Sequence, residues 1–161
     1  MDVMRVALLC AAAFAAVRTP SPGAPADRLV PALWATVATG KAAYAAGEPI
    51  YVTIEVRNES AAEARYPASD PVATFDMTVR DAAGNVVQPV ERTGRPIIAP
   101  HHPLIVPAGT AVAARNVRDG STRLALSEWG YRLPRGTYRI ETASRMPVVG
   151  IRSGPISITI G

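Results

Sequence analysis

The chain of 161 residues is short of the residue types that build covalent and metal-bound frameworks. It has one cysteine, two histidines and a single lysine beside 16 arginines. One cysteine cannot form an intrachain disulfide, so a disulfide-stapled scaffold is excluded. A zinc site needs three or four ligands, which two histidines do not supply alone. Intrinsic disorder is excluded too, because 48% of the residues are hydrophobic and the net charge is only +4.

Sequence patterns typical of catalysis are also missing. The chain contains no Gly-x-Ser-x-Gly nucleophile turn and no glycine-rich phosphate loop. His101 and His102 are adjacent, and neighbouring residues of an extended segment point to opposite sides, so the two cannot both face one metal there. Asp76 and Asp81 are too few oxygen ligands for a calcium loop. We therefore predict no catalytic residue, no metal site and no cofactor.

The first 26 residues differ in character from the rest. Arg5 gives a basic start, an uninterrupted apolar run of 12 residues follows at 6–17, and a stretch rich in Pro, Ser and Gly closes the segment. This order is typical of a secretory signal peptide. Twelve helical residues reach about 18 Å, which is too short for a bilayer core of about 30 Å. We predict that residues 1–26 form a signal peptide or a membrane-associated apolar leader helix, with Ala24-Pro25-Ala26 as a cleavage pattern. A buried N-terminal helix and lipidation at Cys10 stay open as alternatives.

The remainder of the chain is rich in β-branched residues and turn formers. The whole chain has 17 Val and 10 Ile against 8 Leu, which favours strands, and 15 Pro and 12 Gly, which helix interiors tolerate poorly. Short strands separated by turns are typical of a two-sheet antiparallel sandwich. We predict a single all-β domain of about 7–9 strands at 27–161. Strands are expected at 34–39, 50–58, 64–66, 75–80, 86–90, 104–106, 110–117, 137–143 and 156–160. A short strand at 148–151 and a helical turn within 121–129 stay open.

Three stretches carry recognisable strand starts and turns. They are Tyr44–Pro49 leading into Ile50–Asn58, Phe75–Val87 with its Asp81–Asn85 turn, and Leu133–Ile140. Together they resemble the intracellular proteinase inhibitor type of domain and, more loosely, macroglobulin-type Ig-like domains. The resemblance spans most of residues 33–161 and implies an Ig-like β-sandwich. It also implies that Tyr138 is a corner tyrosine, whose hydroxyl bonds back to nearby backbone. It carries over no inhibitory residue.

Positive charge gathers in the last third of the chain. Residues 115–161 carry eight Arg against three acidic residues. This composition fits a solvated arginine-rich surface, or a docking face for an acidic partner or for anionic lipid headgroups. We expect no nucleic-acid partner, because export removes the chain from nucleic acid and no aromatic residues interleave with the arginines.

Two segments are candidates for contact with a partner. The proline-rich loop at 91–103 presents apolar and basic side chains, and its alternative interpretation is an edge strand packed on the core. Trp129 and Tyr131 are residue types that often anchor interfaces, and their alternative is to cap one end of the core. The predicted partner-binding residues are Arg95, Ile97, Ile98, His101, His102, Trp129 and Tyr131.

These features lead to competing functional hypotheses. The leading one is a non-catalytic, extracytoplasmic (periplasmic or secreted) Ig-like domain that binds another protein, as an accessory subunit of an envelope or membrane complex. The alternative is a protease inhibitor that acts through the 91–103 loop, since proline pre-organises a loop for docking. A secreted enzyme or metal-binding protein that uses His101 and His102 is a third hypothesis.

Overall fold

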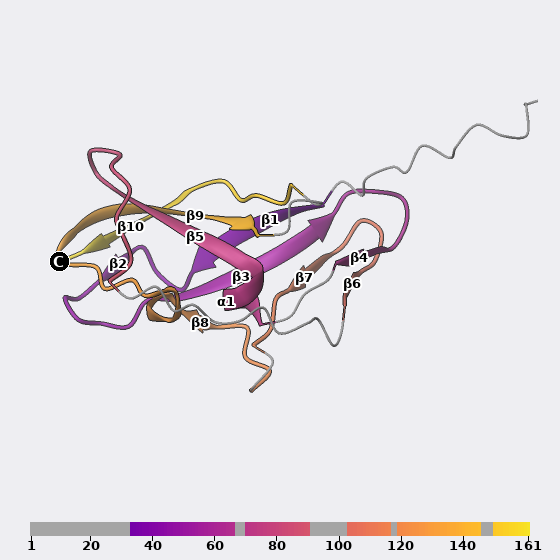
Figure 1. Cartoon of the computed structure of the whole chain (residues 1–161), viewed down its shortest axis with the longest axis horizontal. Coiled ribbons are helices and arrows are strands. Elements are labelled where there is room, and N and C mark those ends of the chain that lie inside the picture. The colour runs from indigo at the N-terminus through magenta and orange to yellow at the C-terminus, as the bar shows by residue number, and fades with distance from the viewer. Residues whose placement is uncertain (1–32, 67–69, 91–102, 117–118, 146–149) are drawn as a thin grey trace, which may run out of the picture.

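The computed structural model describes residues 33–66, 70–90, 103–116, 119–145 and 150–161. Within these ranges, ten strands and two single helical turns follow one another along the chain (Figure 1). The elements are β1 (Leu33–Thr39), β2 (Ala43–Tyr44), β3 (Tyr51–Asn58), β4 (Ala64–Tyr66), α1 (Pro71–Thr74), β5 (Phe75–Asp81), β6 (Leu104–Val106), β7 (Ala111–Ala113), β8 (Leu124–Ala125), η1 (Leu126–Trp129), β9 (Gly136–Ser144) and β10 (Ile156–Ile160).

Strand β3 is the centre of the first sheet, which we call sheet A. It pairs antiparallel with β1 over the whole length of β1, and with β7 and β8 along its other edge. Val52, Ile54 and Val56 are fully buried, while Tyr51, Glu55 and Arg57, which alternate with them, are exposed. Alternation with period two gives the sheet one face toward the core and one toward solvent, and the strand itself was predicted at 50–58.

The second sheet, sheet B, has the order β2-β10-β9-β5. Strand β2 joins β10 in parallel, and the other pairs are antiparallel. Ile140 and Ile158 from this sheet are buried in one core cluster with the inward side chains of sheet A. The prediction of an all-β sandwich is therefore confirmed. The small β4–β6 sheet lies at the end of the molecule opposite the C-terminus (Figure 1).

Residues 151–153 link the two sheets along one side. Ser144 N donates to Ile151 O and Ser153 N donates to Thr142 O, both at 2.8 Å, which attaches the segment to β9. On its other side, Ala35 N of β1 donates to Arg152 O at 3.2 Å. The segment thus covers part of the β1 edge, and backbone groups that would otherwise be open for pairing are satisfied.

Tyr138 has the role that the family resemblance implied. Its ring is buried, and its hydroxyl donates to Pro134 O four residues upstream at 3.0 Å. Gly136 lies beneath the ring with φ of 152°, and a Cβ there would come within 3.2 Å of the Tyr138 hydroxyl oxygen. Glycine is therefore required at this position both for its backbone conformation and for the space it leaves.

Some predicted elements differ from the structure. The expected strand at 86–90 is reduced to one isolated bridge between Arg80 and Val86, and β7 is shorter than 110–117. No strand or helix was expected between 66 and 75, but α1 begins at residue 71. Asp70 caps this turn by accepting from Val72 N at 3.0 Å, and a proline suits the first helical position. The apolar leader at 1–26 and residues 148–149 of the expected strand at 148–151 lie outside the described residues.

Candidate functional site

The loop between β2 and β3 divides two hollows on the surface. Glu48 and Pro49 line both of them. A tight turn sets this loop, with Glu48 N donating to Ala45 O at 3.0 Å and Gly47 at φ of 80°. Only glycine reaches that φ without strain, so the turn fixes where the loop stands.

The first hollow, which we call the Arg123 groove, has a volume of about 430 Å³. Arg123 lies directly before β8, and the pairing of β8 with β3 places the Arg123 side chain over Tyr51. The guanidinium carbon lies 4.8 Å from the centre of the Tyr51 ring, within the range of a cation–π interaction. The groove is lined by Gly40, Lys41, Tyr44, Glu48, Pro49, Tyr51, Thr53 and Arg123.

On the other side of the groove, Lys41 is held by two neighbours. Its Nζ lies 2.6 Å from Glu48 Oε1 and 5.0 Å from the centre of the Tyr44 ring. The second carboxylate oxygen of Glu48 accepts from Ala45 N at 2.9 Å. The hydrogen bond from Lys41, followed by the one from Ala45, lowers the pKa of Glu48 below its usual 4.5. Glu48 is therefore ionised at neutral pH, and its charge is balanced by Lys41.

The Arg123 groove continues onto the solvent side of sheet A. We call this surface the outer β1–β3 face; its residues are Trp34, Thr36, Ala38, Tyr51, Thr53, Glu55 and Arg57. Trp34 is 44% exposed and stands opposite Arg57, whereas Tyr51 is 37% exposed at the other end of β3. Six residues of strand separate Tyr51 from Arg57, or about 20 Å. Aromatic and arginine side chains thus mark both ends of one flat surface.

The solvent side of sheet B has a different composition. Arg139 of β9 is exposed there, as are Ser157 and Thr159 of β10. Arg80 of β5 pairs with Glu141 of β9 at 3.5 Å. Among the described residues of these strands, no aromatic side chain is exposed on this side. The two faces of the sandwich therefore differ, and the exposed aromatic residues belong to sheet A.

The second hollow, the end groove, has a volume of about 640 Å³. It opens between the β2–β3 loop, η1 and the chain after Tyr131. Most of its walls are apolar, from Ile50, Leu126, Leu133 and Ile160, with the exposed Arg132 beside them. It is a hollow at the end of the core, and its polar lining residues include Glu48, Ser127 and Tyr131.

Trp129 and Tyr131 cover the outer edge of β5. Trp129 Nε1 donates to Phe75 O and the Tyr131 hydroxyl donates to Met77 O, both at 2.8 Å. Gly130 between them has φ of 83°, which turns the chain so that both side chains reach the same strand edge. Burial raises the pKa of Tyr131 above 10.0. Both rings are buried in the core cluster.

This arrangement is the one expected if the two rings cap the core. Edge carbonyls of β5 that would otherwise be open for pairing with another chain are satisfied by side chains. The partner-binding role of Trp129 and Tyr131 stays a prediction, and with exposures of 6% and 7% they offer a partner little surface.

The other predicted contact residues, Arg95, Ile97, Ile98, His101 and His102, lie outside the described residues, so the structure brings none of them to a site. Within the described ranges, no group of three or more His, Cys, Asp or Glu side chains is placed to hold a metal ion. Asp76 pairs with Arg145 instead, and Asp81 accepts from Asn85 N at 2.9 Å in its turn. The described part of the chain also contains no helix with the length and apolarity needed to cross a membrane.

Asn58, which begins an Asn-x-Ser glycosylation motif, is a buried structural residue. Its Nδ2 donates to Ala62 O at 2.7 Å and to Val106 O at 2.9 Å, and its Oδ1 accepts from Ser60 N and from Ser60 Oγ. The side chain joins the end of β3 to the β4–β6 sheet. A glycan on Nδ2 is incompatible with these two donated bonds.

Sequence reasoning missed the Arg123 groove. One signal was present, since Tyr51 falls on the wet side of the clearest alternating strand, where an aromatic residue is unusual. The residue that contacts Tyr51 could not be predicted from the sequence. Arg123 is 72 residues further along the chain, and only the β3–β8 register brings it to Tyr51.

Comparison with known proteins gives similarity of fold at low identity. No family model and no curated protein matches the chain. A CARDB domain from Pyrococcus furiosus, solved in complex with di-metal ions, is 9% identical with a TM-score of 0.44, over 83% of this chain and 90% of that one. A β-glucosidase from Erythrobacter marinus is 13% identical with a TM-score of 0.43, and one from Listeria innocua, in complex with glucose, is 10% identical with a TM-score of 0.39. Each β-glucosidase match covers 81% of this chain and 16% of the enzyme. Similarity at this level carries no argument about ligand or activity.

Proposed function

We propose that the protein is a non-catalytic binding domain of Ig-like type that docks another protein on the outer β1–β3 face. One observation carries the proposal: this face exposes Trp34, Tyr51 and Arg57, with Arg123 in the groove beside it, whereas the solvent side of sheet B exposes no aromatic residue in its described strands. Trp, Tyr and Arg are the residues enriched at the energetic centres of protein interfaces.

The length of the face also favours a protein as the ligand. Small molecules bind in enclosed hollows that bury most of their surface. Here the aromatic residues lie about 20 Å apart on a sheet, which is the scale of a protein contact. The extracytoplasmic location and the role as an accessory subunit of an envelope or membrane complex belong to this proposal, and they rest on the leader-like sequence at 1–26.

The protease-inhibitor hypothesis rests on loop 91–103, of which Pro103 alone is among the described residues. It stays a prediction from the sequence, as does the hypothesis of an enzyme or metal-binding protein that uses His101 and His102.

Affinity capture from gently solubilised membranes tests the proposed function. We expect the full chain to co-purify with a protein partner and Trp34→Ala to lower the amount captured about tenfold, the effect of losing about 1.4 kcal/mol at an anchor. Val86→Ala is the matched control, because Val86 is 46% exposed beside β5, on the other sheet. Recovery of the chain alone, or an equal loss in the control variant, contradicts the proposal.

A further inference from the structure

We infer that the Arg123 groove receives a carboxylate side chain from an acidic, extended segment of the partner protein. The inference rests on the proposed function and adds the chemistry of the partner.

The contact with Tyr51 restrains Arg123 for this task. The guanidinium carbon lies 4.8 Å from the ring centre, and the N–H groups of a guanidinium point outward in its plane. A planar fork of N–H donors matches the two oxygens of a carboxylate. Because the ring already restricts the side chain, less rotamer freedom is lost when a ligand binds.

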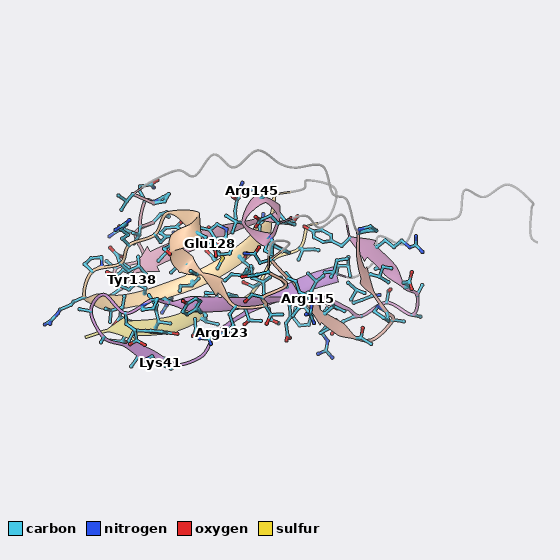
Figure 2. All side chains as sticks on the ribbon, turned by 90° about the horizontal axis from the view of Figure 1, so that it is seen from below. Lys41, Arg115, Arg123, Glu128, Tyr138 and Arg145 are labelled. Atoms are coloured by element: carbon cyan, nitrogen blue, oxygen red, sulfur yellow. The ribbon has the colours of Figure 1, made fainter. Side chains whose placement is uncertain are left out.

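The charge of the groove is positive and unbalanced. Lys41 is compensated by Glu48 within the groove, so Arg123 leaves a net charge of +1 there. No carboxylate among the described residues forms an ion pair with Arg123 or with Arg115. Ala114 N donates to Ile54 O at 2.8 Å, which continues the β7 register and brings the exposed Arg115 toward Thr53. In Figure 2, Lys41, Arg123 and Arg115 follow one side of the molecule, while Arg145 lies on the opposite side.

Apart from Arg115, which is not part of the groove lining, the other cations near this face are paired. Arg57 lies 3.7 Å from Glu59, and Lys41 lies 2.6 Å from Glu48. Within the groove, Arg123 is therefore the cation that is open to a partner carboxylate. Thr53 lines the groove beside it, and Pro49 forms an apolar wall.

The same surface argues for a protein segment over a lipid surface. Recognition of anionic lipid typically uses four to eight clustered Lys or Arg residues. Here Glu55 is exposed among the cations, and it would repel a continuous anionic surface. An extended segment places separate carboxylates with polar or apolar side chains between them, and it can lie along the 20 Å of β3 while avoiding Glu55.

A peptide titration tests the inference. The probe is a fluorescein-labelled dodecapeptide of alternating glutamate and threonine, and its counterpart has glutamine in place of glutamate. Binding to the full chain is followed by fluorescence anisotropy. We expect the glutamate peptide to bind more tightly than the glutamine peptide, and Arg123→Gln to weaken it about fivefold, the upper range for an exposed ion pair. Arg123→Lys should bind the glutamate peptide almost as weakly as Arg123→Gln, because lysine lacks the planar fork of N–H donors.

Arg139→Gln is the matched control, because it removes the same charge from an exposed position of sheet B. We expect it to change the affinity less than twofold. Equal losses in the two glutamine variants, or equal affinity for the two peptides, overturn the inference. Binding of phosphatidylglycerol vesicles that depends on Arg123, without binding of the glutamate peptide, overturns it in favour of a lipid surface. If Trp34→Ala lowers partner capture but Arg123→Gln does not, the proposed function stands and this inference fails.

Discussion

Replacement of Asn58 by alanine gives the sharpest test of how the sandwich is held together. The side chain is fully buried and makes four hydrogen bonds, of which the one to Val106 O is enclosed. Loss of the donor to a buried carbonyl costs about 1–3 kcal/mol, because that carbonyl keeps its desolvation penalty. The other three bonds lie nearer the surface, where water replaces them in part, and they add about 1 kcal/mol together. We expect Asn58→Ala to lower the free energy of unfolding by about 2–4 kcal/mol.

Urea unfolding followed by tryptophan fluorescence measures this loss directly. Asn85→Ala is the control, because Asn85 is exposed in the β5 turn and its Nδ2 bonds only to Asp81 Oδ2 at 3.1 Å. We expect that control to lose less than about 1 kcal/mol. A loss below 1 kcal/mol for Asn58→Ala, with an unchanged denaturant slope, would refute the view that Asn58 is a buried link between β3 and the β4–β6 sheet.

Three further predictions follow from the same contacts. Tyr138→Phe removes the corner hydrogen bond and leaves the ring in place, so thermal denaturation should show a loss of about 1 kcal/mol; a wild-type melting temperature would argue against the corner. Trp129→Phe removes the donor to the β5 edge and part of the buried ring, so urea unfolding should show a loss of about 2 kcal/mol in the free energy of unfolding. An unchanged free energy would count against the role of Trp129 in covering the β5 edge. The pKa of Glu48 is lowered mainly by Lys41, so this pair stabilises the fold above pH 4.5, and its contribution is lost as the pH falls through the lower pKa of the folded state. In the Glu48→Gln variant, the free energy of unfolding should therefore fall less as the pH is lowered below 4.5. An equal fall in the variant and the wild type would contradict this role of the pair.

Local sequence signals were sufficient for most of the sandwich. The alternation in 50–58 and 156–160 is a direct consequence of one buried and one wet face, so it could be read without neighbours. The corner role of Tyr138 came from the family resemblance, which rests in part on the local Leu133–Ile140 stretch. These features need no knowledge of which strand pairs with which.

The elements that were missed depend on contacts between distant segments. β2 has two residues and exists because β10 pairs with it in parallel, which nothing in Ala43–Tyr44 reveals. The β-branched residues at 86–90 favoured a return strand, but Trp129 and Tyr131 take edge carbonyls of β5. Tertiary contacts overrode local propensity there.

The candidate site shows the same limit. Exposed aromatic residues on a strand could be anticipated from alternation alone, as at Tyr51. The pairing of Tyr51 with Arg123 could not, because it depends on the β3–β8 register. Trp129 and Tyr131 drew attention as interface residue types, yet their polar atoms serve the β5 edge.

Site-specific cross-linking tests the central claim, that a partner docks on the outer β1–β3 face. Cys10 is the chain's single cysteine, so a Cys10→Ser background allows one new cysteine to carry a short photoactivatable linker. Thr36→Cys places it on the outer β1–β3 face, and Ser157→Cys places it on the solvent side of sheet B; both positions are exposed. With the captured partner bound, we expect a cross-linked adduct from position 36 and none from position 157. Cross-linking from position 157 alone, or equally from both positions, would contradict the account.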